Sequence, residues 1–313
     1  GGRGAGGLSF ASRRLALIGT GLINGSLALA LKRAGAVDDV VGCARHEATL
    51  ERARARGLCD RATTDARAAV AGADLVVLGT PPAAIGEVAA RIAPALEADA
   101  VVTDVGSVKE VVVRAVSAVL PRPGRFVGGH PVAGTEHSGP DAAFASLFEQ
   151  RRCIVTPVAG TDPAAVARVR AMWELVGATV DEMTPEHHDR VLAVTSHLPH
   201  LIAYTIVGTV ADLEEQARAE VFKYAAGGFT DFTRIAASDP VMWRDVFLNN
   251  REATLEMLGR FTEDLIALQR AIRWGQGDVL EELFTRTRTI RRGVVEAGQA
   301  YVRQPEDPLA AKP

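Results

Sequence analysis

Apolar runs alternate with amphipathic stretches over the first part of the chain. From Arg14 to about Val180, short β-branched runs are separated by alanine-rich segments of helical periodicity, the pattern of strands and helices that build a mostly parallel sheet. Near-continuous apolar runs are typical of strands covered on both faces. We expect strands at residues 15–19, 40–44, 75–80, 100–106, 125–129 and 153–157.

The pattern changes at Thr184. Thr184 can cap a helix and Pro185 suits its first turn, and helical periodicity then continues to about Ala300. The sequence therefore predicts an α/β fold, with an N-terminal Rossmann-type doubly wound parallel sheet over residues 13–184 and an all-helical domain over 185–300. Residues 1–12 read as a flexible leader and 301–313 as a disordered tail.

One apolar stretch, Val191–Val210, is long enough to raise the question of a membrane span. Polar residues interrupt it, among them Ser196, His197 and His200. We expect a buried core helix here and no membrane association.

Composition narrows the range of functions. The formal net charge of −3 provides no broad positive field, so nucleic acid is not an expected partner. The three cysteines, Cys43, Cys59 and Cys153, lack the spacing of a disulfide framework or a zinc site. The first dozen residues lack the apolar core of a signal peptide. Together these features predict a cytoplasmic protein.

A glycine-rich turn joins the first predicted strand to the first helix, in the run LALIGTGLINGSLALALKRAG. Gly19 and Gly21 allow a tight turn and a close approach of the backbone to a diphosphate. Asn24 stands where G-x-G-x-x-G has its third glycine, so we expect slightly altered helix packing. A tight turn without a ligand is the alternative. The residues that we assign to cofactor binding are Gly19, Thr20, Gly21, Leu22, Ile23, Arg45, His46, Thr80 and Pro81.

The end of the second strand bears on the choice of cofactor. An acid there would bind the ribose 2′-hydroxyl, whereas an arginine can pair with a 2′-phosphate. The chain has Arg45 and His46 there and no acid until Glu47. We therefore favour NADP and keep NAD open; Arg45 could also be an ordinary exposed residue at the start of a helix.

Four segments carry polar groups that a purely structural role would not need. They are TDVGSVK (103–109), GGHPVAGTEHSGPD (128–141), TSHLPH (195–200) and GGFTDFTRIAASDPVMWRD (227–245). The first two follow predicted strands and so belong at the carboxyl edge of the sheet, where open α/β folds bind ligands. A site that combined all four segments would lie between the sheet and the helical domain.

These segments, in this order after a dinucleotide-binding turn, resemble the prephenate/arogenate (cyclohexadienyl) dehydrogenase family. The resemblance covers about residues 13–300. It implies hydride transfer from prephenate or arogenate to a nicotinamide, coupled to decarboxylation, in tyrosine biosynthesis. It also implies that the helical domain binds substrate and pairs two chains as a homodimer, and that tyrosine can act as an inhibitor at the active site.

The resemblance assigns the chemistry to two residues. His130 would accept the proton of the C4 hydroxyl, and a neutral imidazole with a reference pKa of ~6.5 suits that role near pH 7. Ser107 would fix the geometry of the nicotinamide and the hydroxyl. The alternative for Ser107 is that it caps a helix beginning near Val108. No metal is expected, because the nicotinamide accepts the hydride.

Further residues are implied to bind the substrate, which carries two carboxylates. Arg234 offers a planar fork to one of them, with His200 as its companion. Thr135 and Glu136 lie on a loop that could close over the ring. His197 is either a substrate residue or a satisfied core histidine; its spacing from His200 would also suit a metal, which we disfavour because no acid or cysteine is near.

Other residues of these segments read as structural. We expect Trp243 and Arg244 to serve packing or an interface, and His187 and His188 to be exposed to solvent. Two other functions stay open. One is an NADP dehydrogenase of the β-hydroxyacid type, which would need a catalytic lysine in the helical domain; Lys223 is the one lysine there before the tail. The other is a non-catalytic NADP-sensing dimer. The preference between prephenate and arogenate is also open.

Overall fold

The computed structural model describes residues 10–135, 137–213, 215, 220–221, 223–224 and 227–294. Glu136 and most of the predicted leader and the whole predicted tail lie outside these residues. The chain divides into two compact units, with the boundary between Arg251 and Glu252. Each unit is therefore described by itself.

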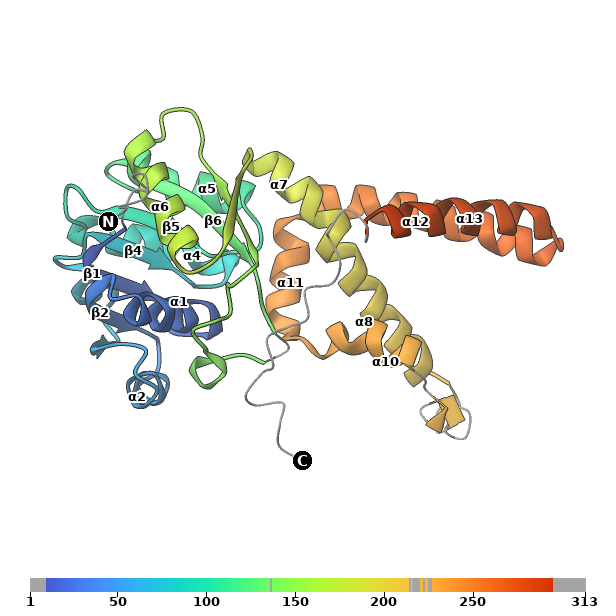
Figure 1. The fold of residues 1–313 in the computed structure, drawn as a ribbon, viewed down its shortest axis with the longest axis horizontal. Coiled ribbons are helices and arrows are strands. Elements are labelled where there is room, and N and C mark those ends of the chain that lie inside the picture. Colours follow the sequence, from blue (N-terminus) through green and yellow to red (C-terminus); the bar gives the residue numbers. More distant parts are fainter. Residues whose placement is uncertain are drawn as a thin grey trace, which may run out of the picture. The chain divides into compact units, whose positions relative to one another are not determined.

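An eight-stranded sheet is the centre of the first unit, with the order β3-β2-β1-β4-β5-β6-β7-β8 (Figure 1). All neighbouring strands are parallel except the pair β6 and β7. The strands are β1 (Ser12–Ile18), β2 (Val37–Cys43), β3 (Arg61–Thr63), β4 (Leu75–Leu78), β5 (Val101–Asp104), β6 (Phe126–Val132), β7 (Arg152–Thr156) and β8 (Thr179–Glu182).

Helices cover both faces of this sheet. Successive residues of β1 enter different apolar clusters, Leu15 and Leu17 one and Ala16 and Ile18 the other, because side chains alternate across a strand. Both clusters are closed by helices. The helices that connect strands are α1 (Leu22–Arg33), α2 (Glu47–Ala55), α3 (Ala66–Val70), α4 (Pro82–Ile92), α5 (Glu110–Ser117) and α6 (Pro163–Leu175).

The doubly wound fold predicted from the sequence is confirmed, and all six predicted strands are present. Two strands were not predicted, β3 and β8, which form the two edges of the sheet. Their sequences, RAT and TVDE, contain little apolar surface because no further strand covers them.

Helices follow the last strand, beginning with α7 (Pro185–Leu192), whose N-cap is the predicted Thr184. A π-helical turn, Ala193–His197, joins α7 to α8 (Leu198–Ala211). Further along the chain, the described residues form α10 (Gly227–Thr233), a 3-10 turn (Arg234–Ala237) and α11 (Pro240–Asn249).

The prediction of a buried core helix over Val191–Val210 is wrong for the single chain, because Ala203 is the one buried residue of α8. Pro185–Ala211 has the length and apolar composition of a membrane-crossing helix, and 22% of its apolar 18-residue stretch is buried. The apolar residues of α8 are spread around the helix, so its own chain covers only part of them.

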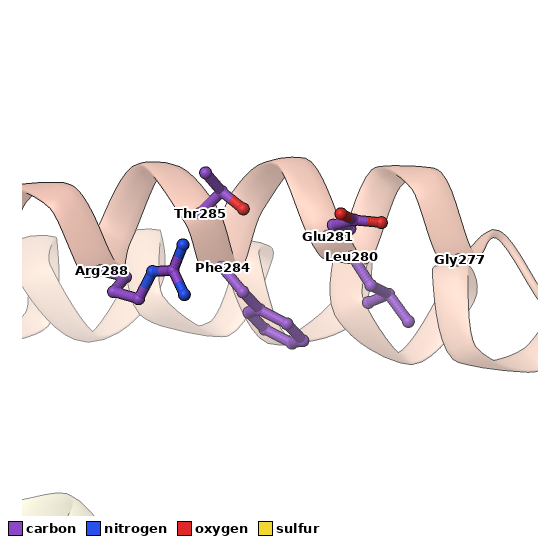
Figure 2. A pocket seen from close by; sticks show the side chains of 6 residues that line it. All are labelled: Gly277, Leu280, Glu281, Phe284, Thr285 and Arg288. Atoms are coloured by element: carbon purple, nitrogen blue, oxygen red, sulfur yellow. The ribbon is translucent and has the colours of Figure 1, made fainter.

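The second unit contains two long helices, α12 (Arg251–Arg273) and α13 (Gly277–Val294). Many of their large apolar side chains are exposed, including Ile272, Trp274 and Phe284. A hollow of about 370 Å³ lies on α13, where Leu280 and Phe284 project from the same side of the helix (Figure 2). This unit has an apolar surface that the described residues do not cover.

Candidate active site

The glycine-rich turn between β1 and α1 is tightly fitted to its neighbour. Gly19 has a φ of +96°, and a Cβ there would approach the carbonyl oxygen of Gly79, after β4, to 2.6 Å. Only glycine fits both the backbone conformation and the space. Gly21 is the N-cap of α1 and has no side-chain cap, and a Cβ on it would meet nothing within 4 Å. The turn thus presents free N–H groups to open space.

Asn24 takes a specific role in this turn. It is 2% exposed, and its Nδ2 donates to the carbonyl oxygen of Gly19 at 2.8 Å. A Cβ on Gly79 would lie 2.4 Å from the same Nδ2. Gly25, the next residue, is also closely packed, since a Cβ there would lie 2.9 Å from the Cβ of Ala143. The amide of Asn24 thus fastens the turn at the position where the motif has its third glycine.

Two hydroxyls beside this turn have no hydrogen-bond partner. The Oγ1 atoms of Thr20 and Thr80 are buried and unpaired in the described part of the chain. A buried unpaired hydroxyl costs about 1–3 kcal/mol, which indicates that a ligand supplies the missing partners. Open space at Gly21, the start of α1 and these hydroxyls fit a dinucleotide with its diphosphate on the turn.

The other residues assigned to the cofactor lie on neighbouring turns at the same edge of the sheet. Arg45 and His46 follow β2, are exposed, and have no ion pair or side-chain hydrogen bond among the described residues. Glu47 pairs with Arg54 at 3.0 Å rather than with Arg45. Pro81 is exposed at the start of α4. Leu22 and Ile23 differ from these, because they pack into the apolar core beneath the turn.

His130 lies on β6 itself and begins a relay of hydrogen bonds. Its Nδ1 lies 2.7 Å from Nε2 of His188, and Nδ1 of His188 lies 2.7 Å from Oδ1 of Asp189. A carboxylate can only accept, so His188 donates from Nδ1 and accepts at Nε2. His130 must then donate from Nδ1. Its Nε2 is left with a lone pair, which is the form of a general base.

The prediction that His188 is exposed is wrong, whereas His187 is exposed as predicted. His188 is fully buried because α7 turns this side chain toward β6, and only its neighbour faces solvent. Burial lowers the pKa of both His188 and His130, and the nearby positive charge of Lys109 adds to the effect. Both rings are therefore neutral at pH 7.

Asp189 has a second task at the start of α5. Its carboxylate accepts from the backbone N–H groups of Lys109 at 2.8 Å and Glu110 at 3.0 Å. A carboxylate from another helix thus caps α5, and the alternative that Ser107 caps it is wrong. Ser107 is half-buried, and no described residue bonds to its hydroxyl. That hydroxyl is free to contact a ligand.

A buried ion pair lies below His130. Lys109 is fully buried and its Nζ donates to Oδ2 of Asp104 and, at 2.7 Å, to the carbonyl oxygen of Gly129. Oδ1 of Asp104 in turn accepts from the N–H of Gly129 at 3.0 Å. Both polar groups of the residue before His130 are therefore held by this pair, and the pair fixes where β6 presents His130.

His197 and His200 lie nearby on the π turn and α8. His197 is 1% exposed and shares a hydrogen bond of 3.0 Å with Asn250, while its Nε2 is buried and unpaired. Burial lowers the pKa of His197 to about 4. Nδ1 of His200 donates to the carbonyl oxygen of Ser196 at 2.8 Å, and its ring stacks on Trp243 with 3.6 Å between centroids. Trp243 packs as predicted, directly on the expected substrate residue.

Electrostatic effects connect four of the predicted residues. Burial is the main cause that lowers the pKa of His130, His197 and His200, and the charges of His197, His200 and Arg234, respectively, add to it. Arg234 is exposed at the start of its 3-10 turn. These four form one cluster within the first unit. Thr135 is not linked to it by any described hydrogen bond, since its hydroxyl bonds to His137 in its own loop.

Sequence reasoning missed the residues behind His130. Asp104 and Lys109 stood within a quoted motif without a role, and His188, Asp189 and Asn250 were not assigned to the site. The available signal was helical spacing, because His188 and Asp189 lie on the face of α7 that Pro185 and Leu192 also share, and these four are its buried residues. Within the described residues there is no group of three or more histidine, cysteine, aspartate or glutamate side chains that could hold a metal ion.

Comparison with protein families gives two matches that together span most of the chain. Residues 27–182 match the nucleotide-binding domain of prephenate dehydrogenase, and residues 184–286 match its dimerization domain. The cyclohexadienyl dehydrogenase of Zymomonas mobilis is 44% identical over 279 residues, which cover 89% of this chain and 95% of that protein. The prephenate dehydrogenase of Bacillus subtilis is 36% identical over 88% of this chain and 73% of that protein.

Solved structures agree with these matches. Prephenate dehydrogenase from A. aeolicus, in complex with hydroxyphenyl propionate and NAD+, has a TM-score of 0.84 and 36% identity, covering 91% of this chain and 99% of that one. Arogenate dehydrogenase from Synechocystis has a TM-score of 0.75 and 31% identity, covering 90% of this chain and 99% of that one. The chain belongs to the prephenate dehydrogenase family.

Proposed function

We propose that this protein is a nicotinamide-dependent dehydrogenase that oxidatively decarboxylates prephenate, arogenate or both, in tyrosine biosynthesis. The observation that carries the proposal is the state of His130. The relay through His188 to Asp189 leaves Nε2 of His130 as an acceptor, and burial keeps the ring neutral. Family membership supplies the reaction to which a base in this position belongs.

His130 removes the proton from the C4 hydroxyl of the substrate ring. The C4–H bond breaks as a hydride is lost, and the hydroxyl becomes a carbonyl. The nicotinamide supplies the hydride acceptor when it is bound. The bond to the ring carboxylate then breaks, carbon dioxide leaves, and its electron pair moves into the ring, which becomes aromatic as the C4 carbonyl oxygen becomes a phenolate. This oxygen takes a proton to give the product hydroxyl. The relay spreads the positive charge that His130 acquires toward the carboxylate of Asp189.

Substrate anchoring falls to residues around His130. We assign one substrate carboxylate to Arg234, whose guanidinium can bind it through two parallel hydrogen bonds, and place His200 and His197 beside it. Ser107, with its free hydroxyl, would orient the reacting C4 hydroxyl. Thr135 and Glu136 belong to the loop that would cover the ring. Burial lowers the pKa of His200 and the positive charge of Arg234 adds to this effect, which supports placing the two groups near one another.

We further propose that the cofactor is NADP in preference to NAD. The exposed guanidinium of Arg45 and the ring of His46 follow β2, where the ribose 2′ position belongs in this fold. Glu47, the nearest acid, is occupied by Arg54. The end of β2 therefore offers a positive charge and no free carboxylate to the ribose.

We also propose that the protein forms a homodimer, which the surface of the second unit supports. Ile272, Trp274 and Phe284 are between 56% and 71% exposed, more apolar surface than a monomer commonly leaves in water. A second copy of this chain would cover it, as the dimerization-domain match also suggests. We propose in addition that tyrosine inhibits at the active site, since it shares the ring and side chain of the product. Three buried, unbridged cysteines fit a cytoplasmic location.

The test is the variant His130→Asn, assayed with prephenate and arogenate and with both cofactors. We expect kcat to fall by about 10²–10⁴-fold, the usual contribution of a general base, while cofactor affinity stays within twofold, roughly 0.4 kcal/mol. Loss of activity with retained cofactor binding supports catalysis by His130. Full activity in this variant would contradict the mechanism, and cofactor binding without turnover of either substrate by the wild-type protein would contradict the function.

A further inference from the structure

Asn250 connects the relay behind His130 to His197. It is the C-cap of α11 and is 5% exposed. Its Nδ2 donates to the carbonyl oxygen of Asp189 at 2.8 Å and lies 3.0 Å from Nδ1 of His197. A single amide group from α11 therefore holds both α7 and the π turn.

The bond to Asp189 decides the proton position on His197. A backbone carbonyl only accepts, so the amide nitrogen of Asn250, and not its oxygen, must face this pair. The same nitrogen then donates to Nδ1 of His197, which must be unprotonated. Because burial keeps His197 neutral, its proton is on Nε2. This Nε2–H is buried and has no acceptor among the described residues.

The two groups that Asn250 joins are connected to the two ends of the π turn. The carbonyl oxygen of Asp189 also accepts from the N–H of Ala193, where the turn begins, and His197 is its last residue. A π turn contains an extra residue compared with an α-helix, and such turns are frequent at functional sites. Reversion to α-helix would rotate the side chains that follow by ~100° about the axis. His200 is among them.

We propose that Asn250 is a positioning residue that fixes the Nε2–H tautomer of His197 and holds the π turn. Its amide acts on both sides of the site, through the main chain of Asp189 and the ring of His197. His197 then presents a donor that an oxygen of an anionic substrate can accept. The use of that donor rests on the proposed function, whereas the tautomer does not.

The tautomer can be measured directly in the ligand-free protein. The chain has seven histidines, so ¹⁵N-histidine labelling gives a small set of ring signals in long-range ¹H–¹⁵N spectra. The variant His197→Gln identifies the signals of His197. In the wild-type protein we expect a protonated Nε2 and an unprotonated Nδ1. In Asn250→Asp a carboxylate faces Nδ1, and we expect Nδ1 to become protonated.

Kinetics give the functional measurement. We expect kcat/KM for the substrate to fall by about 10–100-fold in Asn250→Asp and Asn250→Ala, the effect of losing one fixed hydrogen bond to a charged group. Cofactor KM should stay within about twofold, because the side-chain hydrogen bonds of Asn250 in the described part of the chain go to Asp189 and His197 and not to a residue assigned to the cofactor. Asn249→Ala is the matched control, since the amide of Asn249 bonds within its own helix, to the carbonyl oxygen of Asp245 at 2.7 Å.

The outcomes separate this proposal from the proposed function. A wild-type His197 with its proton on Nδ1 overturns the proposal, as does an unchanged tautomer in both Asn250 variants. If Asn250→Asp does not fold, Asn250→Ala provides the same decision, because His197 should then lose its single tautomer. The wild-type protein could show the predicted tautomer and its change in the variants and yet turn over neither substrate. That result would contradict the proposed function and support the positioning role of Asn250.

Discussion

The glycine-rich turn and the histidine cluster, which consists of His130, His188, His197 and His200, are built in opposite ways. In the turn the backbone is tightly fitted, through Gly19 and Gly79, while the hydroxyls of Thr20 and Thr80 have no hydrogen-bond partner among the described residues. In the cluster, hydrogen bonds between side chains fix the geometry: His130 bonds to His188, and His188 bonds to Asp189. The turn offers several donors to an anion, whereas the relay ends in a single acceptor.

This difference shows how one sheet edge can serve two kinds of chemistry. An anion is held by backbone N–H groups whatever its detailed orientation, so the turn needs shape and little else. Proton transfer needs one lone pair in one place, which requires each tautomer to be fixed by the next group. The buried pair of Asp104 and Lys109 serves this second need by holding Gly129, the residue before His130.

The relay is tested most strongly by His188→Asn. The substitution removes the acceptor of the Nδ1–H of His130, so that the tautomer of the base is no longer fixed. We expect kcat to fall by about 10²–10³-fold, within the usual range for a compromised general base. Substrate and cofactor KM should change by less than about threefold. Steady-state kinetics with both substrates measure the effect.

The matched control is His187→Asn, at the adjacent exposed position. It should leave kcat unchanged. If His188→Asn retained nearly full kcat, the relay would not be needed to place the proton on His130. The histidine cluster would then contribute through its shape, as the turn does.

Acid should destabilise the cluster more than the turn. Burial lowers the pKa of His130, His188 and His197 below the unfolded value of ~6.5, to about 4 for His197. Below that unfolded value the unfolded chain binds more protons, so the free energy of unfolding falls as pH falls. The loss is at most about 1.4 kcal/mol per pH unit for each histidine. Urea unfolding of the ligand-free protein between pH 7 and pH 4.5 measures it.

The variant His197→Gln should reduce this slope between pH 6.5 and its folded pKa of about 4, because one of the titrating groups is gone. A slope equal to that of the wild-type protein would mean that His197 is not buried as a neutral ring.

Sequence alone predicted the parts of the site that depend on local motifs. Gly19 and Gly21 were assigned because a strand, a turn and a helix follow one another within a few residues. The doubly wound fold followed from the same alternation, and only the short polar edge strands β3 and β8 escaped prediction. His130 and Arg234 were assigned through a family resemblance, which states what a residue does and not what holds it.

The relay could not be predicted in this way. His188 is separated from His130 by 58 positions, and its burial depends on how α7 packs against α5 and β7. The pattern of the first turn of α7 is polar, so exposure was the natural expectation for both histidines. The capping of α5 by Asp189 could not be predicted for the same reason, because the capping residue lies 80 positions away from Lys109.

On the side of the turn, Asn24→Gly restores the common glycine pattern and should nevertheless weaken cofactor binding. It removes the donor to the carbonyl oxygen of Gly19 and leaves space against Gly79. We expect cofactor Kd to rise about fivefold, the value of one ordinary hydrogen bond, with kcat unchanged. Asn24→Ala separates this effect from the cost of glycine in a helix. Fluorescence titration measures Kd, and tighter binding by the glycine variant would contradict the fastening role.

The smallest expected effect concerns the ribose. Arg45→Ala removes an exposed charge that no described residue pairs with, and we expect the ratio of kcat/KM for NADP to that for NAD to fall by about three- to tenfold. Arg33→Ala is the control, because Arg33 lies at the far end of α1 and pairs with Glu149. Measurement at low and high salt adds a second criterion, since a contact with a 2′-phosphate weakens with ionic strength. An unchanged ratio in Arg45→Ala would remove this arginine from cofactor selection and leave the turn, with its hydroxyls, to bind both cofactors alike.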